Sequence, residues 1–342
     1  MSLLDQYHAL RRAAAIVDRS ARGRLLLSGA DRRSYLQGLL SNDILALTAG
    51  SGCYATYLTA QGRMIADLRV FELGDSLLVD LSGTLAQTVA DRWSQFIFSE
   101  DVEVRNVSQS TAQIGIYGPC AGEALLSAFE GALAPGEAPD LQVLRSLPVY
   151  SNARWHFEGN LATVLVSDDI GVMGFDVVLA ADSHDEFATR LRRWGAIDAE
   201  PTAAEITRVE GGRPLFLTDM HDDTIPLEAG IEDRAISLTK GCYVGQEIII
   251  RVLHRGHGRV ARKLVGITLD KGAAVPSPGA IISSGTREVG AITSAVISPE
   301  LGRPIALGYV HRDFVAAGTA VDVAGIPASV AALPFVPVTP LV

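Results

Sequence analysis

Lys240-Gly241-Cys242-Tyr243-Val244-Gly245-Gln246-Glu247 is the most specific stretch of this sequence. It places one cysteine between two glycines in a chain that has only three cysteines. A free thiol has a pKa of about 8.5, and the thiolate is the form that attacks electrophiles or binds metals. Lys240 would supply a nearby positive charge, and a helix opened by Gly245 would add backbone N–H groups that lower the thiol pKa further. Cys242 is therefore predicted to be functional, with a buried, small apolar side chain as the alternative.

The composition bounds the class of protein. A chain of 342 residues suggests two or three structural units. Because 48% of the residues are apolar and 20% are charged, the chain is predicted to be globular rather than disordered. The formal net charge of -10 argues against general binding of nucleic acid, since phosphates are repelled by an acidic surface.

The same sequence predicts a cellular location. It shows no secretory signal, and no uncharged apolar run approaches the roughly 18 residues that a membrane span needs. Cys53, Cys120 and Cys242 form no paired spacing, so a disulfide framework is not expected. We expect a cytoplasmic protein without a membrane partner.

Short β segments and helices follow one another irregularly along the first three quarters of the chain. Residues 54–59, 64–71 and 77–81 are predicted to be strands, and a helix is predicted over residues 85–96. Because there is no regular βαβ alternation, α+β layers are favoured over a doubly wound parallel sheet. From residue 261 onward, valine and isoleucine recur between Gly and Pro turns, which predicts a small all-β barrel.

The octapeptide resembles, residue for residue, the K-G-C-Y-x-G-Q-E signature of the YgfZ family. That family comprises folate-binding relatives of the glycine-cleavage aminomethyltransferase that act in iron–sulfur cluster maintenance. The resemblance extends over most of the chain, from residues 25–31 to residues 333–335. It implies three modules in a ring around a central folate channel: two interleaved α+β units of the ferredoxin-like type and a C-terminal all-β barrel.

The resemblance also implies module boundaries. The barrel is expected over residues 259–342, and the folate-binding region over residues 1–258. The two interleaved modules of this region are expected to comprise residues 1–50 with 110–200, and residues 51–109 with 201–258.

Asp67 is the first site candidate outside the octapeptide. Residues 62–70 resemble the G-G-x-I-x-D-L segment of the aminomethyltransferases, whose aspartate lies beside the folate nitrogens that carry the one-carbon unit. By this resemblance Asp67 is a catalytic candidate, because a carboxylate can orient or deprotonate an amine and stabilise a developing cation. Tyr54, which precedes it in residues 52–58, is assigned to the same folate pocket. The structural alternative for Asp67 is a polar residue that alternates outward on a strand.

Three more residues fall on segments that resemble folate-contacting ones. Residues 171–176 resemble G-x-x-G-F-E/D, so Asp176 is expected to accept hydrogen bonds from the pterin, with a surface turn as the alternative. Arg208 and Glu210 lie in a match to R-x-E-x-G. Two residues apart, they would share one face of a strand, and we expect them either to form a structural ion pair or to line the ligand channel.

Within the octapeptide, the resemblance implies one catalytic residue, Cys242, beside a set of folate-contacting residues. The folate-contacting candidates are Lys240, Gly241, Tyr243, Gly245, Gln246 and Glu247. Tetrahydrofolate, or a folate that carries a one-carbon substituent, is the implied ligand. No spacing typical of a metal site is found in the chain.

The stretch Arg251–Lys263 is basic and lies in a region without any acidic residue from 248 to 269. Its basic members are Arg251, His254, Arg255, His257, Arg259, Arg262 and Lys263. Such a strip would attract the acidic tail of folate, tRNA phosphates or an acidic partner. The alternative is a solvated β edge blunted by charge.

Three functions compete at this point. The favoured one is a folate-dependent accessory protein for the synthesis or repair of iron–sulfur enzymes, including tRNA-modifying ones, with iron–sulfur proteins or their assembly factors as partners. The second is a tetrahydrofolate-dependent aminomethyltransferase or demethylase, although such enzymes carry a D-F-x-G-x-E-like segment without the cysteine of Cys242–Glu247. The third is a non-catalytic module that binds RNA or protein through the basic strip.

Overall fold

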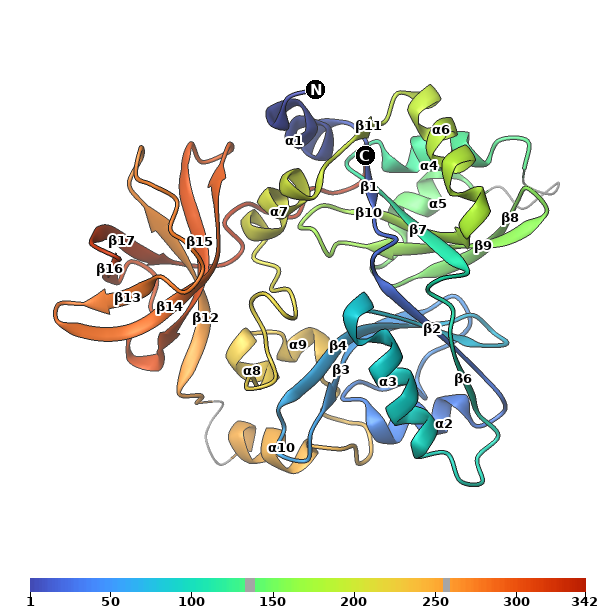
Figure 1. Ribbon diagram of the computed structural model, residues 1–342, viewed down its shortest axis with the longest axis horizontal. Helices are drawn as coiled ribbons and strands as arrows, with labels where there is room; N and C mark the ends of the chain where they lie inside the picture. Colours follow the sequence, from blue (N-terminus) through green and yellow to red (C-terminus); the bar gives the residue numbers. More distant parts are fainter. Residues whose placement is uncertain (133–138, 255–258) are drawn as a thin grey trace.

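Three modules surround a central region in the protein (Figure 1), for which a computed structural model describes residues 1–132, 139–254 and 259–342. Two modules are built on sheets, one with six strands and one with five, and the third is a closed barrel. The predicted α+β class with a C-terminal all-β barrel is confirmed. Among the described helices, none has the length and apolar character that would let it cross a membrane.

The first module is the six-stranded sheet with the order β11-β1-β7-β10-β9-β8. Its strands are β1 (Ala15–Asp18), β7 (Thr111–Tyr117), β8 (Asn152–Phe157), β9 (Asn160–Ser167), β10 (Gly174–Ala180) and β11 (Ile197–Asp198). The helices of this part are α1 (Leu3–Arg12), α4 (Ala121–Phe129), α5 (Leu141–Ser146), the short 3₁₀ helix η1 (Ala181–Ser183) and α6 (His184–Trp194). The core holds Phe129 at 4.9 to 5.7 Å, between ring centroids, from Trp155, Phe157 and Phe187 in edge-on contacts.

The second module is the five-stranded sheet with the order β3-β4-β5-β2-β6. Its strands are β2 (Gly23–Ser28), β3 (Gly52–Leu58), β4 (Met64–Glu72), β5 (Leu77–Leu81) and β6 (Glu103–Asn106), and its helices are α2 (Arg32–Leu39) and α3 (Gly83–Gln95). The strands predicted at 54–59, 64–71 and 77–81 correspond to β3, β4 and β5.

One predicted boundary differs from the sheet topology. Residues 1–50 were expected to stay with residues 110–200, but β2 pairs antiparallel with β5 and β6 of the second sheet. Leu25 and Leu27 on β2 are buried in the core of that sheet. The chain therefore passes from the first module to the second near residue 20, because burial of these two leucines and the strand pairing act together.

The barrel closes with the order β12-β15-β14-β13-β16-β17, and all its pairings are antiparallel. Its strands are β12 (Arg262–Leu269), β13 (Ile281–Ser284), β14 (Arg287–Ser298), β15 (Arg303–His311), β16 (Ala320–Val323) and β17 (Ile326–Ala331), with the 3₁₀ helix η2 (Arg312–Phe314). Four helices lie between the barrel and the sheets (Figure 1): α7 (Pro201–Glu210), α8 (Pro226–Ala229), α9 (Glu232–Ala235) and α10 (Gln246–His254).

The octapeptide leads into α10, which begins at Gln246 as predicted. Gly245 has a φ of 87°, in the left-handed region that favours glycine. A Cβ atom at this position would lie 2.5 Å from the carbonyl oxygen of Thr59 and 3.1 Å from the Cβ of Leu58. Gly241 has neither constraint, since a Cβ there would meet no heavy atom within 4 Å. Gly245 thus lets α10 start directly against the turn between β3 and β4.

Arg69 joins the two sheets through buried ion pairs. It lies on β4, is 1% exposed, and its Nη2 is 3.0 Å from Asp80 on β5. Its Nη1 is 2.8 Å from the carboxylate of Asp176 on β10, and 2.9 Å from that of Asp169. It also donates a hydrogen bond of 2.9 Å to the Ser167 hydroxyl on β9. One guanidinium therefore compensates acidic side chains from both modules.

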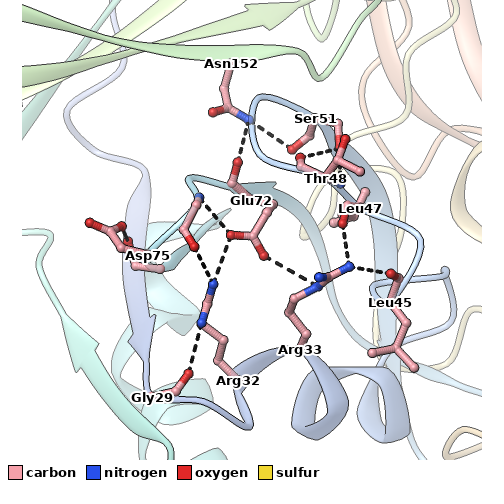
Figure 2. Close-up of polar contacts among 12 residues, drawn as sticks. Gly29, Arg32, Arg33, Leu45, Leu47, Thr48, Ser51, Glu72, Asp75 and Asn152 are labelled. Atoms are coloured by element: carbon pink, nitrogen blue, oxygen red, sulfur yellow. Dashed lines mark hydrogen bonds and ion pairs between the residues drawn. The ribbon is translucent and has the colours of Figure 1, made fainter.

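A second contact between the same modules lies around Glu72, at the end of β4 (Figure 2). Its carboxylate accepts a hydrogen bond of 3.2 Å from Arg32 and lies 3.6 Å from Arg33, both on α2. Asn152 on β8 donates its side-chain N–H groups to the backbone carbonyls of Ser51 (2.9 Å) and Glu72 (3.3 Å). A side-chain amide of one sheet therefore binds backbone carbonyls of the other module at the end of β4.

Arg69→Leu is expected to destabilise the fold by about 3–5 kcal/mol, because the carboxylates of Asp80, Asp169 and Asp176 lose one of the cations that compensate their charge. Burial alone would raise the pKa of Asp80, but Arg22 and Arg69 hold this pKa well below its usual range. The stabilisation from Asp80 is therefore present above the ordinary aspartate pKa of about 4 and is lost as the pH falls below it. Urea unfolding should show that Arg69→Leu lowers the free energy of unfolding more at pH 7 than at about pH 3.

Arg105→Leu, in an exposed ion pair on β6, is the control and should lower the free energy of unfolding by less than about 1 kcal/mol. Equal effects at the two positions would contradict the assignment.

Gly245→Ala is expected to destabilise the protein by about 1–3 kcal/mol, since alanine combines an unfavourable φ with a clash against the β3–β4 turn. Gly241→Ala is the matched control and should leave the free energy of unfolding nearly unchanged. Denaturant unfolding of both variants checks the prediction. If the two substitutions cost the same, the tight contact at Gly245 is not a structural requirement.

Candidate functional site

A cavity of about 450 Å³ lies where the two sheets, α7 and the segment that follows α7 meet. It receives Asp67 and Arg69 from β4 and Arg208 from α7. Of the predicted site residues, three line this cavity: Tyr54, Asp67 and Arg208. The structure thus brings together side chains that are more than 140 positions apart in the sequence.

Tyr54 and Asp67 form a hydrogen-bonded pair on the cavity wall. The phenol oxygen of Tyr54 donates to Oδ2 of Asp67 over 2.8 Å. In the antiparallel register of β3 and β4, Tyr54 faces Arg69, and Asp67 lies two residues from Arg69 on the same strand. Since residues two apart on a strand share a face, Tyr54 and Asp67 are diagonal neighbours on one face of the sheet.

The protonation of this pair follows from its burial. Burial raises the pKa of Tyr54 well above its usual value, and the charge of Asp67 raises it further, so the phenol remains a hydrogen-bond donor. Burial also raises the pKa of Asp67, although the charge of Arg22 and the hydrogen bond from Tyr54 oppose that shift. A carboxylate with a raised pKa takes up a proton more readily, which suits a general base.

Arg208 and Glu210 do not lie on a strand, contrary to our expectation, because residues 201–210 form α7. A proline at the first helical position and the helix-forming run that follows it explain this outcome. Two residues apart on a helix, their side chains point in different directions. The predicted ion pair between them is therefore wrong, and each side chain has other partners.

Arg208 connects α7 to the barrel while it lines the cavity. Its Nη1 donates to Asp219 over 2.7 Å, and its Nη2 donates to the Ser294 hydroxyl on β14 over 2.8 Å. Glu210 is fully buried and accepts hydrogen bonds from Tyr7 (2.9 Å) and Ser298 (2.5 Å). Glu210 is not among the cavity-lining residues, and its contacts are those of a residue that ties α1 and the barrel to α7.

Asp176 is fully buried on β10, so the alternative of a surface turn is wrong. It accepts a hydrogen bond of 2.7 Å from the phenol of Tyr117 and pairs with Arg69. It contacts the cavity wall through Arg69 but is not itself a lining residue. Contact between Asp176 and a pterin therefore stays a prediction.

Lys240 uses all of its donor capacity on the backbone. Its ammonium group donates to the carbonyl oxygens of Gln37 (2.7 Å), Leu40 (2.5 Å) and Asn42 (2.9 Å), at the C-terminal end of α2. Burial lowers the pKa of Lys240 to about 8. Such an ammonium satisfies carbonyls that the helix end leaves without partners. This lysine anchors the octapeptide to the second module.

The remaining octapeptide residues lie outside the cavity lining. Cys242 is exposed, whereas Tyr243 is buried and its ring lies 5.1 Å, from centroid to Nζ, from Lys240. Glu247 forms an exposed ion pair of 2.5 Å with Arg251 one helical turn later. The folate contacts predicted for Gly241, Tyr243, Gly245, Gln246 and Glu247 stay predictions.

The basic strip is partly neutralised where the structure describes it. Arg262 pairs with Asp223 (2.9 Å) and Glu228 (3.3 Å), and Lys263 lies 3.8 Å from Glu232. Two predicted members, Arg255 and His257, lie outside the described residues. These ion pairs join the strip to the segment between α7 and α10, which argues against a free basic surface for RNA.

Arg234 on α9 is a cavity-lining residue that the sequence reasoning missed. Its guanidinium carbon lies 5.1 Å from the centroid of the Tyr54 ring. No motif in the sequence distinguishes Arg234 from other surface arginines. Among the described residues, no group of three or more histidine, cysteine or acidic side chains is arranged to hold a metal ion.

Comparisons with known proteins agree with this architecture. The GCVT N-terminal domain model matches residues 2–240, and the glycine cleavage T-protein C-terminal barrel domain model matches residues 262–337. Residues 241–261, with Cys242, lie between the two matched ranges.

Named relatives span nearly the whole chain. The aminomethyltransferase of Moorella thermoacetica is 31% identical over 94% of this chain and 85% of its own length. That of Corynebacterium jeikeium is 28% identical over 98% of this chain and 90% of its own length. The crystal structure of the glycine cleavage system aminomethyltransferase T from Bartonella henselae has the same fold, with a TM-score of 0.85 at 21% identity over 98% of this chain and 90% of that one. The chain therefore belongs to the glycine cleavage T-protein family, with that family's N-terminal domain and its C-terminal barrel domain.

Proposed function

We propose that the cavity binds tetrahydrofolate and that the chain is a folate-dependent one-carbon transferase of the aminomethyltransferase type. The observation that carries this proposal is the hydrogen-bonded pair of Tyr54 and Asp67 in the cavity wall. The names of the relatives support it as well. This order reverses the one favoured from the sequence, in which the octapeptide placed the iron–sulfur accessory role first.

The cavity suits a ligand of this kind. Cavities of about 300–1,000 Å³ commonly hold drug-sized molecules, and this one measures about 450 Å³. Its wall combines apolar surface from Leu215, Phe216 and Leu217 with the polar pair. Apolar surface beside a few fixed polar groups is the usual composition of a cofactor site.

The chain's residues have separate tasks in this proposal. Bound tetrahydrofolate supplies the nitrogen atoms that receive the one-carbon unit. Asp67 accepts a hydrogen bond from the folate N–H, and its raised pKa suits it to take up the proton that this nitrogen loses as it bonds to the one-carbon unit. The C–N bond of the aminomethyl donor breaks in the same transfer, and its amine leaves as ammonia. Tyr54 orients the Asp67 carboxylate through its hydrogen bond.

A second function is favoured by one specific observation, the exposure of Cys242. The neighbouring Lys240 and Tyr243 are buried and Gly245 is sterically constrained, but the thiol has no such packing role. An exposed thiol on a rigid support suits a redox-active or transiently ligating group. In this alternative the chain is a folate-binding accessory protein for the synthesis or repair of iron–sulfur enzymes, and its partners are those proteins or their assembly factors.

Tetrahydrofolate is expected to raise the melting temperature of the wild-type protein, because it binds the native state preferentially. Asp67→Asn should keep this shift, since the amide preserves the side-chain volume, but should slow formation of methylene-tetrahydrofolate from an aminomethyl donor by about 100-fold or more. Asp222→Asn, at an exposed position, is the control and should retain both properties. A wild-type protein without a thermal shift at saturating tetrahydrofolate would end the folate proposal. A wild-type rate in Asp67→Asn would show that Asp67 is not the general base.

Cys242→Ser separates the two functions. If the protein is a transferase only, the variant should form methylene-tetrahydrofolate at the wild-type rate, because Cys242 is outside the cavity lining. If it serves iron–sulfur enzymes through this thiol, the variant should fail to restore their activity in cells that lack the protein. Cys120→Ser, at a half-buried cysteine, is the control for both assays. Full restoration by Cys242→Ser would exclude the accessory role of the thiol.

A further inference from the structure

Six arginines line the cavity, and their ion pairing is unequal. They are Arg19, Arg22, Arg69, Arg208, Arg213 and Arg234. The first five have carboxylate partners within ion-pair distance. Arg234 has no carboxylate partner among the residues that the structure describes, and its guanidinium lies against the face of the Tyr54 ring.

The acidic side chains that act on Arg234 already form ion pairs with other arginines. Asp168 pairs with Arg213, and Asp169 pairs with Arg69 at 2.9 Å and with Arg19 at 3.6 Å. Burial opposes the charge of Arg234, but Tyr150, Tyr54 and the carboxylates of Asp168 and Asp169 together raise the pKa of Arg234 above its usual value. The guanidinium of Arg234 therefore lines the cavity without an ion-pair partner among the described residues. A half-buried cation of this kind gains stability from an anion that binds beside it.

We propose that Arg234 anchors a carboxylate of the ligand that occupies the cavity. This inference rests on the proposed function and adds the chemical class of the recognised group. A planar guanidinium binds a carboxylate through two parallel hydrogen bonds. A compact dianion such as phosphate fits less well, because both of its charges would lie close to Asp67 and Asp169, which also line the cavity.

The position of Arg234 relates this carboxylate to the one-carbon site. One face of the Tyr54 ring lies against Arg234, and the phenol oxygen of the same ring donates to Asp67. A ligand with an amine at Asp67 and a carboxylate at Arg234 would therefore lie across a single tyrosine side chain. A tetrahydrofolate carries such groups, with amine nitrogens near its pterin and a carboxylate on its glutamate, and so does an amino-acid substrate.

The test compares Arg234→Leu with Arg234→Lys and with Arg287→Leu. Arg287 lies 5.4 Å from the centroid of the Phe314 ring on the barrel and is outside the cavity lining, so it is a matched arginine–aromatic control. The probes are tetrahydrofolate, the same pteroyl compound with a neutral methylamide in place of glutamate, N-methylglycine and N-methylglycinamide. Calorimetry measures binding, and thermal unfolding confirms that each variant is folded.

Two results support the anchor and distinguish the source of the carboxylate. If the glutamate binds Arg234, Arg234→Leu weakens tetrahydrofolate binding by about 10- to 100-fold and removes the preference over the methylamide. If an amino-acid carboxylate binds there, tetrahydrofolate affinity is unchanged, and N-methylglycine loses its advantage over its amide. In either case Arg234→Lys retains part of the affinity, because it keeps the charge but not the fork geometry, and Arg287→Leu behaves as wild type.

Wild-type affinity for every probe in folded Arg234→Leu would overturn the anchor while leaving the proposed function intact. Absence of tetrahydrofolate binding to the wild-type protein would instead refute the proposed function. The anchor would then stand only if N-methylglycine bound in a manner that depends on Arg234. If the wild-type protein bound no probe, both proposals would fall.

Discussion

The arrangement of the two sheets depends on the buried guanidinium of Arg69. Carboxylates from both modules converge on it, and a buried carboxylate without a cation costs several kcal/mol. The charge of Arg69 therefore favours the orientation of the sheets that brings Asp80 and Asp176 to the same guanidinium. Because Arg69 also lines the cavity, the same contact that fixes the modules fixes the wall on which Asp67 lies, two residues away on β4.

The cavity is lined by several charged side chains because it forms at this junction. Most of its arginines neutralise acids that the docking of the modules has buried, so they serve the fold rather than a ligand. The groups left for a ligand are few: the hydrogen-bonded pair of Tyr54 and Asp67, and the guanidinium of Arg234. A count of arginines would overestimate the affinity of this site for anions, whereas the ion pairing of each arginine singles out Arg234, for which we propose a ligand contact.

The sequence predicted the local elements better than their assembly. Alternation in residues 52–81 was enough to find β3 to β5, and the resemblance around Asp67 then identified the residue that the structure places in the cavity. The expectation for Arg208 and Glu210 failed because the strand assumption ignored the helical signal of the preceding residues 201–207. The placement of β2 in the second sheet depends on pairing with strands about 50 and 80 residues later. Local patterns do not specify such pairings.

The octapeptide is specific as a sequence motif largely for structural reasons. Lys240 binds the end of α2, Tyr243 fills the core beneath α10, and Gly245 allows α10 to begin against the β3–β4 turn. Each of these roles restricts the residue type strongly, because it combines burial with a fixed geometry. Structural roles alone can thus restrict several positions of a motif. Cys242 is different, because no packing requirement explains a thiol at an exposed position. The chemistry proposed for the octapeptide therefore depends on this thiol, and the chemistry proposed for the cavity depends on Asp67, so a substitution can test either one without the other.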